Sequence, residues 1–172
     1  MKKKLFIFGT IGIIAILTVV LVVFGQNNNN SQNQKTPLVD RFEKVIKAKE
    51  PKFDGGRKTT GGAQRKDYSQ LEWKLHEDYV YADVSDYYNL EDAVMTMKNY
   101  VTGLDYRAAP TSASKLTKLG DEAYIELGRN SADIKLRKGN VVIKVSATNA
   151  IVAKRFAKYF VREIEKRDRG EP

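Results

Sequence analysis

One stretch, Leu5–Phe24, limits the organisation of this chain more than any other. It holds twenty residues without a charge, drawn from Leu, Ile, Val, Phe, Gly, Ala and Thr. As a helix it would be about 30 Å long, the thickness of the hydrocarbon core of a bilayer. Lys2, Lys3 and Lys4 precede it, and a basic flank of this kind stays in the cytoplasm. We therefore expect residues 1–25 to be a single-pass transmembrane signal anchor that sends the rest of the chain outward.

A second interpretation of residues 1–25 is a signal peptide cleaved after Gly25, which would leave a secreted protein. Gly25 is a small residue of the kind that signal peptidases accept. The apolar stretch is longer than the roughly 7–15 residues of an ordinary signal-peptide core, which favours retention. The sequence contains no Cys, which excludes disulfides and a lipidated cysteine anchor.

The next segment, residues 26–35, is rich in Asn and Gln and contains no apolar side chain. Such a composition cannot bury apolar area, so we expect a flexible linker. About ten residues of this type span on the order of 17 Å root-mean-square. The linker would therefore keep an extracytoplasmic domain close to the bilayer.

Residues 36–172 are long enough for one domain with a core of its own. The hydrophobic patterns predict a helix, two strands, a helix, three strands and a last helix. Runs of strands without strict alternation with helices indicate an α+β fold, with an antiparallel sheet of about five strands and helices packed on one face. The helices are expected over 37–49, 89–101 and 149–167, and the strands around 71–75, 80–84, 123–127, 134–137 and 141–145.

Residues 54–66 contain four Gly and four basic side chains and are expected to form a loop. A phosphate-binding loop is one interpretation of this composition. That motif requires Gly-Lys-Ser/Thr between a strand and a helix, whereas here Gly56-Arg57-Lys58-Thr59 follows a helix. We favour a solvated basic loop.

The last third of the chain resembles a known pattern. Leu119-Gly120-Asp121-Glu122-Ala123-Tyr124 is followed by Leu136-Arg137-Lys138-Gly139-Asn140-Val141-Val142-Ile143-Lys144-Val145 and an Ala-rich amphipathic helix. This arrangement resembles bacterial extracytoplasmic α+β domains that are attached to lipoprotein signals or membrane anchors, mostly of unassigned function. The resemblance implies a location in the cell envelope and no particular activity. The absence of Cys departs from the lipoprotein members and fits a helix anchor.

The helix expected over 149–167 is strongly amphipathic, with Val152, Phe156, Phe160 and Ile164 on one side. Basic residues repeat every four positions on the opposite side. We call Lys154, Lys158, Arg162 and Lys166 the basic stripe. Two interpretations are open: the stripe contacts anionic lipid headgroups or an acidic envelope polymer, or it is the solvated side of a helix that packs on the core.

Tyr79 and Tyr81 lie on the face of their strand opposite Val80 and Ala82. If that face is uncovered, the two rings form a surface for a peptide, a glycan or a partner protein. If it is covered, they pack beneath a helix or form cross-strand pairs.

The sequence shows no catalytic, cofactor-binding or metal-binding constellation. His76 is the single histidine and is expected in a turn, and the adjacent carboxylates Asp121 and Glu122 do not form an acid–base pair. We expect a non-enzymatic, membrane-tethered extracytoplasmic module that binds a partner protein or an anionic envelope component. The alternative is a cell-envelope hydrolase that uses carboxylates from distant elements. The mixed charge argues against nucleic-acid binding.

Overall fold

The computed structural model describes residues 37–60, 66–102 and 113–172. The expected anchor (1–25) and linker (26–35) lie outside these ranges. Within them, every helix is too short or too polar to cross a membrane. Residues 36–172 belong to one compact unit.

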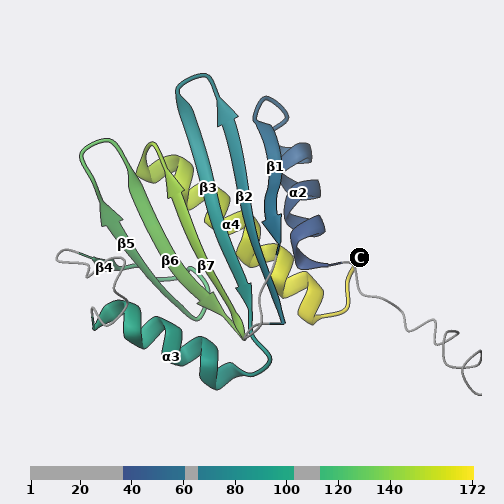
Figure 1. Ribbon diagram of the computed structural model, residues 1–172, viewed down its shortest axis with the longest axis vertical. Coiled ribbons are helices and arrows are strands. Elements are labelled where there is room, and N and C mark those ends of the chain that lie inside the picture. The colour runs from purple at the N-terminus through teal and green to yellow at the C-terminus, as the bar shows by residue number, and fades with distance from the viewer. Residues whose placement is uncertain (1–36, 61–65, 103–112) are drawn as a thin grey trace, which may run out of the picture. The chain divides into compact units, whose positions relative to one another are not determined.

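The described part of the unit is a seven-stranded antiparallel sheet with three helices, which confirms the α+β class. The strands lie in the order β1-β2-β3-β7-β6-β5-β4 (Figure 1). The helices are α2 (Leu38–Lys49), α3 (Leu90–Val101) and α4 (Ala150–Asp168). The strands are β1 (Asp54–Thr60), β2 (Asp67–Leu75), β3 (Asp78–Asp86), β4 (Ser114–Lys115), β5 (Glu122–Leu127), β6 (Ala132–Lys138) and β7 (Val141–Ala147).

The expectation of about five strands was wrong, because β1 and β4 carry no strand pattern in the sequence. β1 occupies the first half of the expected loop and forms the edge of the sheet beside β2. It has no apolar side chain, so backbone pairing with β2 and the ion pairs of Arg57 with Asp40 and Glu43 of α2 hold it there. Gly55 permits this close approach, since a Cβ at that position would lie 2.0 Å from the Glu72 carbonyl oxygen. β4 is only two residues long and pairs with β5.

The expectation that all helices pack on one face was also wrong. α2 and α4 cover one face of the sheet, and α3 packs on the other face, over β6 and β7 (Figure 1). There Ala93 and Met97 of α3 meet Val142 in a second, smaller apolar cluster. Val142 lies between Val141 and Ile143, and such a run of consecutive apolar residues is typical of a strand covered on both sides.

Two helix starts and the first hairpin agree with the sequence. The Asn89 side chain accepts a hydrogen bond from the Asp92 backbone N–H, and the Asn149 side chain accepts from those of Ile151 and Val152. Both residues therefore act as N-caps. β2 and β3 pair along their whole length through a turn at His76, whose φ of 53° is a left-handed conformation.

The main core lies between the sheet and the helices α2 and α4. Its centre is aromatic: the ring centroids of Phe42 and Phe160 are 4.5 Å apart, and those of Trp73 and Phe156 are 5.7 Å apart. Every buried hydrophobic residue of the described chain falls between Leu38 and Ile164. This part of the chain therefore carries its own core and is expected to fold when expressed as residues 36–172.

Replacing Phe160 with Ala tests this core. The side chain is fully buried, so Phe160→Ala should lower the free energy of unfolding of residues 36–172 by about 3–5 kcal/mol in urea titrations. Lys158→Ala on the exposed side of the same helix is the matched control and should change it by less than about 0.5 kcal/mol. Equal losses in the two variants would contradict the packing described above.

Candidate functional site

The basic stripe lies on the outer side of α4. Lys154, Lys158 and Arg162 are exposed and have no ion-pair partner among the described residues. Lys166 differs, because its Nζ lies 2.8 Å from Oε1 of Glu163. Three of the four predicted residues thus present an uncompensated charge to solvent.

The helix α2 lies beside α4 and runs antiparallel to it (Figure 1). At one end, Arg41 Nη1 donates a hydrogen bond to the Glu171 carbonyl oxygen at 2.8 Å. At the other end, Arg155 Nε lies 2.8 Å from Oε1 of Glu50. This arrangement adds Lys44, Lys47 and Lys49, which are exposed on α2, to the same layer as the stripe.

The basic stripe predicted from the sequence did not contain these α2 lysines. The sequence placed these lysines on one predicted helix, but it did not predict that this helix packs beside α4. Seven strands separate α2 from α4 in the chain, so the sequence does not show that the two helices lie side by side. The sequence pattern was equally silent on the pairing of Glu165 with Lys138 and of Glu50 with Arg155.

Each acidic side chain of α2 and α4, with Glu50 at the end of α2, lies close to a cation. Arg57 of β1 binds both Asp40 and Glu43, and Lys138 of β6 lies 3.3 Å from Glu165. Glu50, Glu163 and Asp168 pair with Arg155, Lys166 and Arg167. The residues left without a partner among the described residues form what we call the basic helical face: Lys44, Lys47, Lys49, Lys154, Lys158 and Arg162.

The two candidate tyrosines lie on the sheet face opposite α2 and α4. Tyr79 is 36% exposed, whereas Tyr81 is half-buried. The Tyr81 hydroxyl donates to Oδ1 of Asp83 at 3.1 Å, and the same oxygen accepts from the Tyr68 hydroxyl and from Nε2 of Gln70, each at 3.0 Å. Burial first, and then the Asp83 carboxylate, raise the pKa of Tyr81 to about 12. The Tyr81 hydroxyl is therefore engaged within the sheet, and Tyr79 is the more available of the two.

This cluster makes a measurable prediction for Tyr81. Asp83→Asn removes the negative charge beside the phenol, so the pKa of Tyr81 should fall from about 12 towards 10 while burial keeps it above that value. Spectrophotometric titration measures this, with Tyr81→Phe in each background used to isolate the signal of Tyr81. An unchanged pKa in Asp83→Asn would show that the hydrogen bond to Asp83 is absent in solution.

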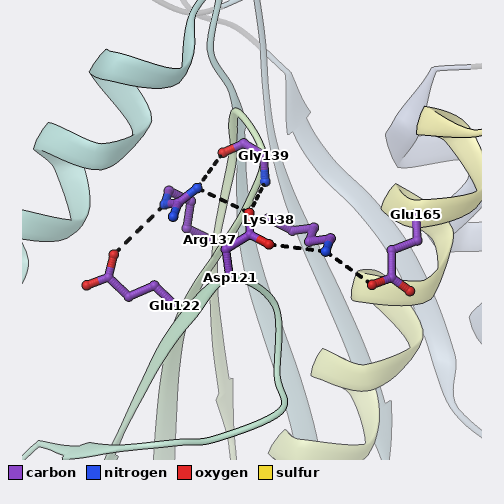
Figure 2. Close-up of polar contacts among 6 residues, drawn as sticks. All are labelled: Asp121, Glu122, Arg137, Lys138, Gly139 and Glu165. Carbon is purple, nitrogen blue, oxygen red and sulfur yellow. Dashed lines mark hydrogen bonds and ion pairs between the residues drawn. The ribbon is translucent and has the colours of Figure 1, made fainter.

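The residues that carry the resemblance form a structural network. Asp121 Oδ2 accepts the Gly139 backbone N–H at 2.8 Å and lies 3.2 Å from Arg137 Nη1, while its Oδ1 lies 3.1 Å from Lys138 Nζ (Figure 2). Lys138 also reaches Glu165 of α4. The backbone is equally constrained: Gly120 has φ +65°, and a Cβ there would lie 2.5 Å from the Arg137 carbonyl oxygen.

This network joins the start of β5, the β6–β7 turn and α4. Glu122 contributes as well, with Oε2 3.9 Å from Arg137 Nε. The Gly-Asp-Glu and Arg-Lys-Gly segments are therefore explained by the folding of this corner.

Asp121 makes this corner dependent on pH. Burial alone would raise its pKa, but the Gly139 N–H, Lys138 and Arg137 together hold the pKa below the usual value of 3.8. A lowered folded-state pKa means that the carboxylate stabilises the fold above about pH 4 and that this contribution is lost as the pH falls through the folded value.

Asp121→Ala should therefore lower the free energy of unfolding by about 1–3 kcal/mol at neutral pH, the usual cost of removing one partner of a hydrogen bond. The difference from the parent protein should shrink as urea titrations move below about pH 4. Asp133→Ala is the control, since its 3.9 Å pair with Lys144 is half-exposed and worth less than about 1 kcal/mol. A pH-independent effect of Asp121→Ala would argue against the charged network.

The structure gives little support to the alternative that this protein is a hydrolase. Burial raises the pKa of Asp86, which makes this residue the first to consider as a catalytic acid. Its oxygens are occupied, because Oδ2 lies 2.7 Å from Arg167 Nη1 and Oδ1 accepts from Asn140 Nδ2 at 2.8 Å. His76 lies in a turn, and the described residues contain no group of His, Asp and Glu that could hold a metal ion. Asp86 is best understood as half of a buried structural ion pair.

Comparisons with known proteins give two loose structural likenesses. No family model matches the chain, and no curated protein matches it. The extracellular domain of PknH from Mycobacterium tuberculosis has a TM-score of 0.44 at 13% identity, over 62% of this chain and 68% of that one. A GTP-binding regulator from Thermotoga maritima has a TM-score of 0.46 at 15% identity, over 73% of this chain and 85% of that one. No function follows from likenesses at this level.

Proposed function

We propose that this protein is a non-enzymatic binding module, held outside the cytoplasmic membrane by residues 1–25, that contacts an anionic component of the cell envelope through the basic helical face. The observation that carries the proposal is the pattern of charge pairing on α2 and α4. Each acid at this layer has a cation within 4 Å, so the lysines and the arginine that remain add up to an uncompensated positive surface.

The position of this surface in the chain supports the proposal. The linker of residues 26–35 leads into α2, which is itself half of the basic helical face. If residues 5–24 span the bilayer, α2 begins within tens of ångströms of the headgroups. Each Lys or Arg close to an anionic bilayer is worth about 1 kcal/mol of binding at moderate ionic strength.

A partner protein on the opposite sheet face is the second candidate. Tyr79 is exposed there and supports it, but the Tyr81 hydroxyl is engaged with Asp83. The hydrolase alternative has less support, because Asp86 is paired with Arg167 and Asn140. We therefore place the anionic component first.

Vesicle co-sedimentation of residues 36–172 tests the proposal. The fragment should pellet with phosphatidylcholine vesicles that contain phosphatidylglycerol and stay in solution with phosphatidylcholine alone, and the binding should weaken with salt. Lys154→Gln/Lys158→Gln removes two unpaired charges, so its partition should fall by up to about 30-fold, at about 1 kcal/mol per charge.

The matched control is Lys98→Gln/Lys115→Gln, which removes two exposed charges from α3 and β4 and leaves the basic helical face intact. It should bind almost as well as the parent protein. Equal pelleting with neutral and anionic vesicles at low salt would overturn the proposal, as would equal losses in the two double variants.

A further inference from the structure

A groove runs between α2 and α4 within the layer that carries the basic helical face. Its volume is about 290 Å³. Val45 and Ala48 of α2 give it apolar lining, and Lys44, Lys49 and Lys166 are the lysines that line it. An apolar surface bordered by ammonium groups is suited to an amphiphile with a negative head.

Some of the charged side chains that line the groove already have partners, and others are free to bind a ligand. The two lining acids are occupied, Asp40 by Arg57 and Glu163 by Lys166. Arg41 donates to the Glu171 carbonyl oxygen, near Pro172 at one end of the groove. Lys44 and Lys49 are exposed and have no ion-pair partner among the described residues. These two ammonium groups are therefore the ones free to bind an anion.

We propose that this groove binds the headgroup of a single anionic phospholipid. The phosphate lies against Lys44 and Lys49, and the glycerol backbone with the first acyl methylenes lies against Val45 and Ala48. Lysine binds phosphate as a point charge with three rotatable donors, so no preformed fork is needed. Free phosphate would gain only the ionic part of this interaction, whereas a lipid also covers the apolar lining.

A bilayer lipid is favoured over other anionic amphiphiles by the chain itself. One wall of the groove is α2, and α2 is the first element after the linker and the twenty-residue apolar stretch. The inference rests on the proposed function, because it names the component that the basic helical face would contact. It adds a defined site to what would otherwise be a diffuse electrostatic attraction.

The test uses residues 36–172 and a short-chain phosphatidylglycerol kept below its micelle concentration, so that no charged surface is present. Titration followed by methyl NMR should show saturable shifts at Val45 and Ala48. Lys44→Gln/Lys49→Gln should weaken binding by at least about tenfold, a change of about 1.4 kcal/mol, because both ammonium groups that bind the phosphate are lost. Lys154→Gln/Lys158→Gln removes the same charge outside the groove and should bind within about twofold of the parent, a change of about 0.4 kcal/mol.

All four lysines are exposed on helices, so both double variants should fold, and urea titration checks this. Equal weakening by the two double variants would overturn the inference. So would identical shifts with inorganic phosphate or short-chain phosphatidylcholine. Tighter binding of a soluble glycerol-phosphate polymer than of the lipid would overturn it in favour of an envelope polymer.

The two proposals fail separately. If the short lipid does not bind but anionic vesicles still pellet the protein, the proposed lipid site in the groove is wrong. The proposed function of the basic helical face is then still supported. If the protein ignores anionic vesicles as well, the proposed function fails with it.

Discussion

The pairing of β3 with β7 is the interaction on which the rest of this structure depends. It joins the β1–β3 part of the sheet to the β4–β7 part, and it runs from Val80↔Ala147 to Asp86↔Val141. Side chains close both ends: Thr148 Oγ1 donates to Asp78 Oδ1 at 2.6 Å, and Asp86 binds Arg167 and Asn140. Because the two strands are more than fifty residues apart in sequence, their alignment is a long-range event that no local propensity supplies.

The same pairing creates the surface on which the proposed function rests. It brings β2 and β3 beside β6 and β7, so that α4 covers the centre of the sheet and α2 packs at its side. Acids of the two helices are then neutralised from the strands, by Arg57 and Lys138, as well as from the helices themselves. The positive charge itself comes from composition, since α2 holds four basic residues against two acidic ones and α4 holds six against three. Tertiary pairing decides which of these basic side chains stay without a partner in the described part of the chain.

Much of the fold could be predicted from the sequence, because the local sequence patterns agree with the way the elements pack. Asn89 and Asn149 cap their helices, Leu71 and Trp73 alternate with polar residues, and the β5–β7 meander follows its turns. The misses have physical reasons. β1 is an edge strand without apolar side chains, held by backbone pairing, and the apolar run at Val142 was not recognised as a sign that α3 covers the second face.

The sequence by itself determined the class of fold, most element positions and the basic stripe of α4, because helical spacing and strand alternation are local properties of the chain. It also determined the expectation of an anchor at residues 1–25, which stays a prediction. Only the tertiary structure decided that Lys166 is paired, that Tyr81 is engaged with Asp83, and that Lys44 and Lys49 lie beside α4. The Lys166 and Tyr81 contacts are short in sequence, but their patterns allow several side-chain partners and only the packed side chains select one. The neighbourhood of Lys44 and Lys49 with α4 joins distant segments, and it exists only once the long-range strand pairing has formed.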